Sequence, residues 1–293
     1  MKKFVILLIA FGFLNVPVLA HSHHHNRYNH PYYNNSSHSE SVYLTHSEYK
    51  VVNQKFQDCD EHYLEIETTT NSYSDGTRRV FYNMTVYNAD GSVLIDNCRN
   101  VEHTLYNNIH YFIVRQQRGG YRIIDGKGNI TTNRDYSYLE ELEPNRIMAK
   151  YDKRYGVIDL NEKTIIPIKY QKFQKYGDRN FISKLNGYWG LVDIDNTELI
   201  KHDCDKITPL YDTLIIKRYK KYGLANRNGY IFLEPVYDNI KKYKEYILIK
   251  KDDKYGLLDF EGKKISEIVY KKIKLDHNTV KGQFNSGKWV VIR

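Results

Sequence analysis

The sequence of 293 residues lacks the short motifs that mark the common hydrolases, metalloproteases and nucleotide-binding enzymes. It contains no G-x-S-x-G nucleophile motif, no H-E-x-x-H zinc motif and no phosphate-binding glycine loop. After residue 20 it also lacks any apolar stretch near the about 20 residues that a membrane-spanning helix needs. We therefore predict that the chain is not an enzyme and has no transmembrane segment beyond residue 20.

Cysteine is scarce, with three residues in the chain. Cys59 and Cys98 are candidates for a disulfide, because exported proteins fold in oxidising compartments. Such a bridge would raise the free energy of unfolding by about 3–4 kcal/mol in the chain-entropy model. Two free thiols are the alternative.

The N-terminus has the pattern of a cleavable secretory signal, which we assign to residues 1–20. Two lysines precede an apolar run from Phe4 to Leu14, and the run is followed by Val18-Leu19-Ala20 at the expected cleavage point. A membrane anchor is the competing interpretation, but Asn15 and Pro17 make the run too short to span a bilayer. We therefore expect the mature protein in the periplasm or outside the cell.

Residues 21–50 are rich in histidine, asparagine and serine and hold little that can pack, so we expect a disordered tether. Four histidines stand at its start, namely His21, His23, His24 and His25. After cleavage, the free amine, two amides and an imidazole would offer the square-planar nitrogen set that suits Cu(II) or Ni(II). A tether that binds Cu, Ni or Zn is one hypothesis, and a polar linker without a ligand is the other.

An aromatic residue followed by glycine recurs in the second half of the chain at intervals of 33 or 34 residues. The series comprises Tyr155-Gly156, Trp189-Gly190, Tyr222-Gly223 and Tyr255-Gly256, and Tyr121 and Trp289 extend it without the glycine. An Asp or Asn follows each of the first five aromatic residues by four positions, and a tyrosine follows each of these by fifteen, with Cys204 replacing the tyrosine once. We expect Cys204 to be a buried apolar substitute. A fixed period of this size indicates a tandem repeat protein.

Each repeat is expected to contain about three short antiparallel strands. The recurring Asp or Asn would bond the backbone of a turn in which glycine takes a positive φ, and Pro167 and Pro235 would end the next strand. The glycine beside each aromatic residue would leave room for a ring of an adjacent strand. We predict an all-β fold in which residues 119–293 form an open, twisted, solenoid-like array. A small β-propeller closed by the last strand is the alternative.

The preceding segment, residues 51–118, shows the same strand-turn-strand rhythm less regularly. We interpret it as an N-terminal β region that includes a diverged repeat, with an exposed hairpin loop over residues 70–78.

The pattern of aromatic-Gly-x-hydrophobic-Asp, then a turn, isoleucines, proline and Tyr-Asp, as in Pro235-Val-Tyr-Asp238, resembles the bacterial WG repeat, also called KWG. The resemblance covers residues 119–293 and is best over 155–262, although only Trp189-Gly190 has the literal dipeptide. It implies a β-rich interaction module without catalytic or cofactor-binding residues.

The net charge of +9 is concentrated near the C-terminus, where residues 201–293 hold 21 Lys or Arg against 12 Asp or Glu. Clusters such as Lys217–Tyr222 and Lys241–Lys244 interleave basic and aromatic residues, which suits a polyanion. Protection of exposed strand edges by lysine is the alternative explanation. We predict an exported, non-catalytic protein that binds a protein or an anionic envelope glycan through its repeats. Secretion disfavours nucleic acid, and a metal-binding protein acting through the histidine tether is the alternative function.

Overall fold

The computed structural model describes residues 42–276 and 279–292, and these contain 25 β-strands and no helix. The expected signal (1–20) and the four tether histidines lie outside the described residues. The expected end of the tether at residue 50 is wrong, because the first strand already begins at Leu44. No helix in the described part of the chain has the length and apolar character needed to cross a membrane.

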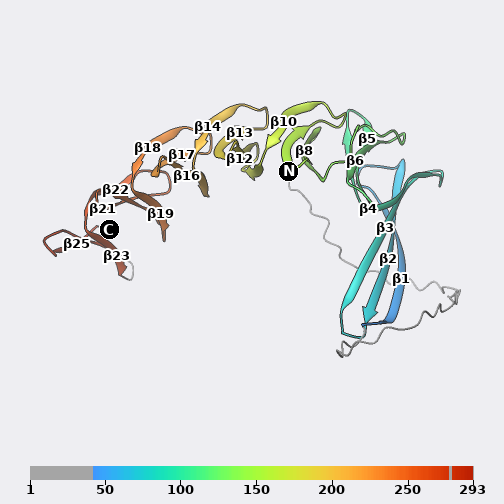
Figure 1. The fold of residues 1–293 in the computed structure, drawn as a ribbon, viewed down its shortest axis with the longest axis horizontal. Coiled ribbons are helices and arrows are strands. Elements are labelled where there is room, and N and C mark those ends of the chain that lie inside the picture. Colours follow the sequence, from blue (N-terminus) through green and yellow to red (C-terminus); the bar gives the residue numbers. More distant parts are fainter. Residues whose placement is uncertain (1–41, 277–278, 293) are drawn as a thin grey trace, which may run out of the picture. The chain divides into compact units, whose positions relative to one another are not determined.

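The strands form six antiparallel sheets that follow one another in chain order (Figure 1). The first sheet has six strands: β1 (Leu44–Lys55), β2 (His62–Tyr73), β3 (Arg78–Asn88), β4 (Val93–Tyr106), β5 (Ile109–Gln116) and β6 (Tyr121–Asp125). The next four have four strands each: β7 (Tyr138–Glu143), β8 (Arg146–Tyr151), β9 (Arg154–Ile158) and β10 (Thr164–Tyr170); β11 (Lys172–Tyr176), β12 (Asn180–Leu185), β13 (Tyr188–Asp193) and β14 (Glu198–Cys204); β15 (Lys206–Leu210), β16 (Thr213–Arg218), β17 (Lys221–Asn226) and β18 (Ile231–Tyr237); β19 (Asn239–Tyr243), β20 (Tyr246–Lys251), β21 (Lys254–Leu258) and β22 (Lys264–Tyr270). The last contains β23 (Lys272–Asp276), β24 (Thr279–Gln283) and β25 (Trp289–Val291).

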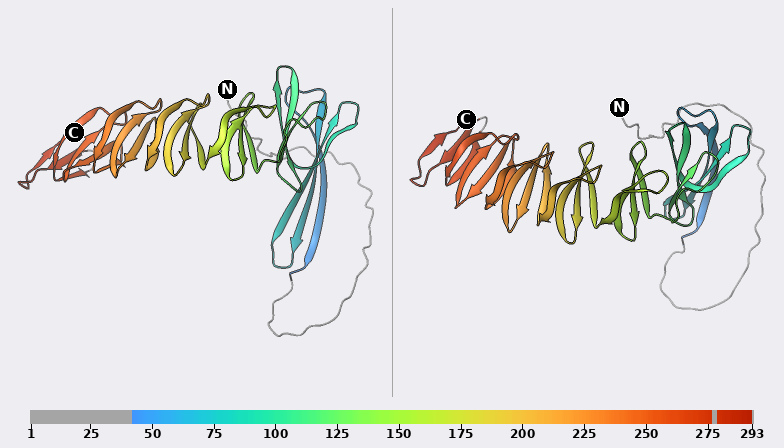
Figure 2. Two further views of the ribbon diagram at one scale, coloured as in Figure 1. Left: turned by 45° about the horizontal axis from the view of Figure 1, so that its top comes forward. Right: turned by 90° about the horizontal axis from the view of Figure 1, so that it is seen from above.

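Each complete repeat therefore has four strands, which corrects the expected count of about three. The first strand of each repeat was missed because one residue, such as Gln171 between β10 and β11, separates it from the last strand of the repeat before. The two strands consequently look like one segment in the sequence, although they belong to different sheets (Figure 2). The missed strands are also short and polar, and Phe173 is the one buried residue of β11.

The N-terminal sheet contains the expected diverged repeat. Met84 of β3 pairs with Cys98 of β4, and the register then shifts before Val86 pairs with Ile95. A larger shift, by one more residue, separates the pairs Tyr155–Tyr170 and Val157–Ile166 in β9 and β10. The repeat boundary expected at residue 119 is less sharp, because β6 with Tyr121 still belongs to the first sheet.

The recurring Asp or Asn organises the turn after the third strand of each repeat. Oδ1 of Asp159 accepts hydrogen bonds from the amides of Asn161 and Lys163, at 2.9 and 2.8 Å. The equivalent bonds form at Asp125, Asp193 and Asn226, and one of the two forms at Asp259. Where the turn contains glycine, as at Gly229, that residue has a positive φ of 84°. The turn chemistry expected from the sequence is therefore present.

The glycine after each aromatic residue allows a neighbouring backbone to approach. Gly156 lies opposite the three residues 167–169, because β10 bulges between the two pairs named above. A Cβ at Gly156 would lie 2.5 Å from the Ile166 carbonyl oxygen, and one at Gly223 would lie 2.4 Å from the Leu233 carbonyl oxygen. The expected aromatic ring over this glycine is therefore replaced by backbone, and at Gly190 the ring atoms nearby belong to His202.

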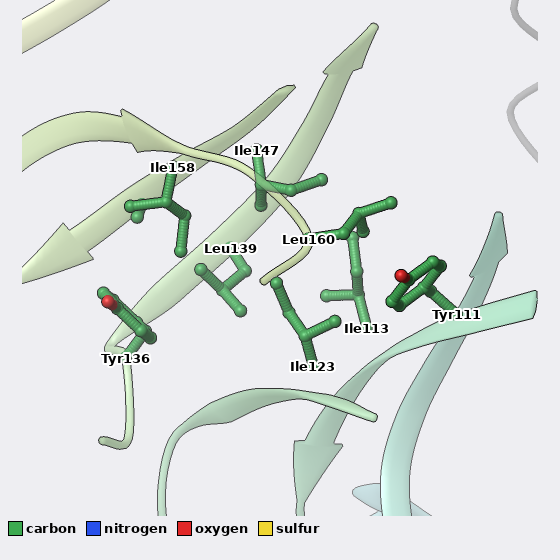
Figure 3. Packing of buried hydrophobic residues seen from close by; sticks show 9 residues of the cluster. Tyr111, Ile113, Ile123, Tyr136, Leu139, Ile147, Ile158 and Leu160 are labelled. Atoms are coloured by element: carbon green, nitrogen blue, oxygen red, sulfur yellow. The ribbon is translucent and has the colours of Figure 1, made fainter. Parts of the chain in front are cut away.

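Successive sheets bury side chains between them. Met148 and Val157 of one sheet share an apolar cluster with Phe181 and Val192 of the next. Figure 3 shows the equivalent layer between the first two sheets, where Ile113, Ile123, Leu139 and Ile147 lie together. Because both faces of a repeat sheet are covered, its two central strands carry consecutive buried residues, as in Phe181–Ser183 of β12.

The array is open, because the last sheet does not share a strand with the first. The last sheet consists of β23, β24 and β25, with no strand contributed by the N-terminal sheet. The propeller alternative required the C-terminal strand to complete the first sheet, whereas β25 pairs with β24. The all-β array predicted from the sequence is thus confirmed.

Candidate binding surface of the repeats

The second and third strands of each repeat are joined by a two-residue turn, and these hairpins lie at equivalent ends of their sheets. Both turn residues have a positive φ, for example 44° and 61° at Asp152 and Lys153. Primed turns of this kind match the twist of antiparallel strands. We call the set of four hairpins, residues 150–155, 184–189, 217–222 and 250–255, the hairpin row.

A basic side chain covers the repeat aromatic residue in every member of the hairpin row. Lys150 pairs directly with Tyr155 across the strands, and its Nζ lies 4.9 Å from the centre of the ring. Lys184 and Trp189, Lys217 and Tyr222, and Lys250 and Tyr255 repeat the arrangement at 5.6, 5.1 and 5.9 Å. These distances are within the about 6 Å at which a cation is attracted to an aromatic face.

The ends of the series depart from this pattern in different ways. Arg115 covers Tyr121 at 5.6 Å, so β5 and β6 reproduce the pair with arginine. Trp289 keeps its place in the register opposite Gln283, and Lys274 of β23 approaches its ring at 4.7 Å. The aromatic positions predicted from the sequence therefore occupy equivalent places in consecutive sheets.

The fourth strand of each repeat places one residue opposite the repeat aromatic residue, and this residue packs against the following repeat. Tyr170, Tyr237 and Tyr270 pair with the aromatic residues of their own sheets, and Cys204 does so in the second complete repeat. Cys204 has no exposed surface and shares a cluster with Ile216 of the next sheet. Burial raises the pKa of its thiol, which fits the expected apolar role.

The hairpin row is basic and aromatic. Its 24 residues include 11 Lys or Arg and three Asp. Tyr151, Tyr188 and Tyr219 add exposed rings, with 41%, 51% and 86% of their surface accessible. Two other exposed tyrosines, Tyr211 and Tyr230, lie at the strand ends away from the hairpin row. Exposed tyrosine rings are therefore not confined to the hairpin row.

Hydrogen bonds between repeats hold the hairpins in place. The residue after Tyr170 and the residue after Tyr237 each reach the next hairpin turn: Gln171 Oε1 accepts from the Gly187 amide at 2.9 Å, and Asp238 Oδ2 accepts from the Asp252 amide at 2.8 Å. Asp205 accepts from the Lys220 amide in the same way, at 3.2 Å. This contact explains the acidic or amide side chain at these three positions, whereas Lys271 stands at the equivalent position after Tyr270.

The opposite ends of the strands carry an ion-pair network that also joins repeats. Glu143 and Arg146 of one repeat interact with Arg179 and Asp195 of the next, with nitrogen–oxygen distances of 2.7–3.0 Å. The arginines lower the pKa of the Asp195 carboxyl through hydrogen bonds and charge. Because these side chains are partly exposed, we assign the network a role in aligning the repeats more than in stabilising them.

One hydrogen-bonded chain has the residue order of a catalytic triad. Glu198 Oε1 lies 2.6 Å from His202 Nδ1, and His202 Nε2 lies 2.8 Å from the Ser183 hydroxyl. The bond from His202 lowers the pKa of the Glu198 carboxyl. Ser183 has no exposed surface, however, so a substrate carbonyl does not reach its hydroxyl in this structure. These hydrogen bonds instead give the buried Ser183 hydroxyl a partner, as buried polar groups require. The His202 ring lies beside the Tyr170 ring, with ring centres 5.5 Å apart.

The expected pairing of Cys59 with Cys98 is wrong, because both are free thiols in the structure. Cys98 occupies the column of the diverged repeat and lies in the core of the first sheet. Cys59 instead lies beside His103 and His110, between β1 and β2.

Comparison with known proteins agrees with this geometry. The model of the WG containing repeat matches residues 155–181 and 222–255, which begin at the aromatic-glycine dipeptides Tyr155-Gly156 and Tyr222-Gly223 and include the hairpin of residues 250–255. The chain contains WG repeats. Its WG repeats form an interaction module of the β-repeat type.

No curated protein matches the chain. Two of the solved structures similar to it are the AfRom2 CNH domain and the β-propeller domain of the Trilobed protease from Pyrococcus furiosus. Both are 10% identical in sequence and cover 86% of this chain and 98% of their own, with TM-scores of 0.30 and 0.28.

Proposed function

We propose that this WG repeat protein is an exported, non-catalytic binding protein whose hairpin row binds an extended anionic ligand, an acidic glycan of the cell envelope. The observation that carries the proposal is the recurrence of a lysine over an aromatic ring in the same register of four consecutive sheets. An acidic polysaccharide offers a regularly spaced negative charge and a sugar face at each unit, which such a row would match.

Charge and exposure support this ligand class. Lys153, Arg154, Lys220 and Lys251 are exposed on the hairpin row, close to the exposed rings of its tyrosines. Sheets packed face to face are about 10 Å apart, so the row repeats its basic groups at a spacing suited to a linear polymer. Ammonium groups on an aromatic background attract anions and still allow ring stacking.

Export is supported by the sequence of residues 1–20. The proposal requires that a cell expressing the whole gene product release a protein that begins at His21. N-terminal sequencing of the periplasmic and culture fractions tests this, and a protein retained in the cytoplasm with Met1 in place would contradict it.

The binding experiment compares an acidic with a neutral polysaccharide. We expect the full chain without residues 1–20 to bind immobilised polygalacturonate more tightly than dextran, with affinity falling as salt rises. Replacement of Lys153, Lys220 and Lys251 by glutamine should weaken binding at least about tenfold, since each exposed contact contributes up to about 1 kcal/mol.

The matched control changes the same charge elsewhere. Lys163, Lys241 and Lys263 are exposed on β19 and in the turns after β9 and β21, and their replacement by glutamine should leave binding within about twofold, because they lie outside the hairpin row. Equal losses in both triple variants would show attraction by net charge alone. Equal binding to dextran, or binding of neither polysaccharide, would refute the glycan and favour a protein ligand.

A further inference from the structure

A cluster of metal-ligating side chains lies in the N-terminal sheet, apart from the hairpin row. The hairpin of β4 and β5 turns at Asn107 and Asn108, and its register places His103 opposite Phe112 and Leu105 opposite His110. Both histidines therefore project from the same face of the hairpin. His103 Nε2 and His110 Nδ1 are 2.8 Å apart.

The segment between β1 and β2 lies against this face and adds a thiol. Cys59 has 4% of its surface exposed, and its Sγ lies within 4.8 Å of a ring nitrogen of both His103 and His110. The three ligand atoms come from two parts of the chain that are more than 40 residues apart in sequence. Such convergence of a thiol and two imidazoles is the usual composition of a protein site for a borderline-soft metal.

His62, the first residue of β2, provides an independent sign of an incomplete site. It has 5% of its surface exposed, and within the described part of the chain neither of its ring nitrogens has a hydrogen-bond partner. Leaving a buried polar group unpaired costs about 1–3 kcal/mol, so such groups in native proteins call for a partner. The His62 ring stands edge-on to His110, with ring centres 5.4 Å apart.

The surroundings of the cluster are apolar, which favours neutral imidazole. Phe56 and Phe112 stand 5.0 and 5.4 Å from the His103 ring.

We propose that Cys59, His103 and His110 bind a zinc ion, with His62 as the fourth ligand. Zinc prefers four ligands in a tetrahedron, with about 2.3 Å to sulfur and about 2.0–2.1 Å to nitrogen. Two nitrogens on such an ion are about 3.3 Å apart, so the contact between His103 and His110 opens by about half an ångström on binding. The Cys59 thiol loses its proton to solvent as the sulfur–zinc bond forms.

A carboxylate also lies near one of the proposed ligands, beyond hydrogen-bond distance in this structure. Glu61 Oε2 lies 3.8 Å from His110 Nε2, the nitrogen that would not bind the metal. A carboxylate in this position orients a metal-binding histidine and increases its basicity. Calcium and magnesium are disfavoured, because they prefer oxygen ligands and the cluster has a sulfur and imidazole nitrogens.

Cobalt spectroscopy on the full chain without residues 1–20 tests the site directly. Titration with Co²⁺ should give a thiolate-to-cobalt charge-transfer band and the intense visible bands of tetrahedral cobalt, both saturating at one ion per chain and both displaced by Zn²⁺. The absence of the charge-transfer band would overturn the proposal without requiring any variant. Displacement by Cu⁺ but not by Zn²⁺ would overturn the assignment to zinc.

Variants then locate the ion. Cys59→Ser should abolish the charge-transfer band, whereas Cys204→Ala, a change at another buried thiol, should retain it. Glu61→Gln should weaken zinc binding, because a carboxylate beside a metal-binding histidine increases the basicity of its ring. A chain in which His21, His23, His24 and His25 are all replaced by asparagine should bind zinc unchanged at this site, and loss of the band there would place the metal on the N-terminal segment.

A folding readout separates metal binding from damage to the fold. Zinc should raise the Tm of the wild type and leave that of Cys59→Ser unchanged, because a ligand stabilises only the state that binds it. Circular dichroism should show the same β-sheet signal for both proteins. Since the hairpin row does not contain these residues, binding of polygalacturonate should be the same with zinc and with a chelator, so the two proposals fail independently.

Discussion

Asp238 Oδ2 of one repeat accepts a hydrogen bond from the Asp252 amide in the hairpin of the next, over 2.8 Å. The other carboxylate oxygen lies 2.5 Å from Lys221 Nζ in its own sheet. Asp238 thus joins two hairpins of the row, and the Tyr-Asp of the WG pattern becomes a joint between repeats.

Replacing Asp238 by alanine should lower the free energy of unfolding by more than the control below, because the turn amide loses its acceptor and Lys221 its partner. Urea denaturation followed by circular dichroism measures the change. Asp212→Ala is the matched control, since Asp212 is 79% exposed and pairs with Arg227 of the same sheet. It should cost less than about 0.5 kcal/mol. Equal effects in the two variants would contradict the role of Asp238 as a joint.

The glycine after the aromatic residue should tolerate no side chain. In Gly223→Ala the new Cβ would lie 2.4 Å from the Leu233 carbonyl oxygen and 2.8 Å from the Pro235 nitrogen, both backbone atoms. We expect a loss of more than about 3 kcal/mol in the free energy of unfolding, from strain that side-chain rotation does not relieve. Chemical denaturation of the purified variant measures it.

Gly187→Ala provides the comparison for that change. Gly187 has a φ of 89° and open space around the position of a Cβ. Its substitution should therefore cost only the about 1–2 kcal/mol of a left-handed conformation. A larger loss at Gly187 than at Gly223 would show that turn conformation matters more than the approach of the bulged strand.

At several junctions the residue that packs from one repeat onto the next is matched in size to its neighbour, although Tyr237 and Ile249 are both large. The ring of Tyr270 lies against Gly282, where a Cβ would be 2.4 Å from a ring carbon. The buried Tyr136 shares a cluster with Ala149, whereas the small Cys204 shares one with the larger Ile216.

Cys204→Tyr should therefore destabilise the protein by about 1–3 kcal/mol through overpacking. The double variant Cys204→Tyr with Ile216→Ala should recover most of that loss, since it restores the combination of a large and a small residue. A double-mutant cycle from urea titrations measures the coupling. Additive effects of the two substitutions would refute this matching in size.

Alkaline pH should weaken the N-terminal sheet through Cys98. Burial raises the pKa of this thiol to about 12, from a value of 9.0 in the unfolded chain. The folded state therefore keeps the proton that the unfolded state loses. The resulting stability is fully present below about pH 9 and is lost as the pH rises toward 12. Cys98→Ala should show a shallower fall in the free energy of unfolding from pH 8 to 11 than the wild type, and equal slopes would exclude this cause.

The repeat, its turns and the burial of apolar side chains between neighbouring repeats could be predicted from the sequence, because these features depend on residues that recur at a fixed interval. Asp159 and Gly229 predict a turn by their own chemistry. The strand of Phe173 was missed because its single buried residue leaves no alternation to detect. The cause of the glycine at position 156 was also missed. Three residues of β10 bulge opposite this single residue of β9, and the sequence does not show where such a bulge falls.

The cluster of metal-ligating side chains could not be predicted from the sequence. Cys59 and His62 are separated from His103 and His110 by two long strands, and only the pairing of β4 with β5 brings the latter two onto one face. The many histidines of the tether were a stronger compositional signal. The cysteine pairing failed for the same reason: spacing along the chain does not determine which face of a strand a thiol occupies.

The passage from each sheet to the next through one residue has a consequence for how such proteins change in length. Removing residues 205–237 would join Cys204 to Asp238, which already begins the following crossing between sheets. The same cut at any boundary deletes a whole module and leaves the remaining joints intact. Copy number can thus vary by recombination within the gene, and each added module would lengthen the reach of the protein along a polymer by one step.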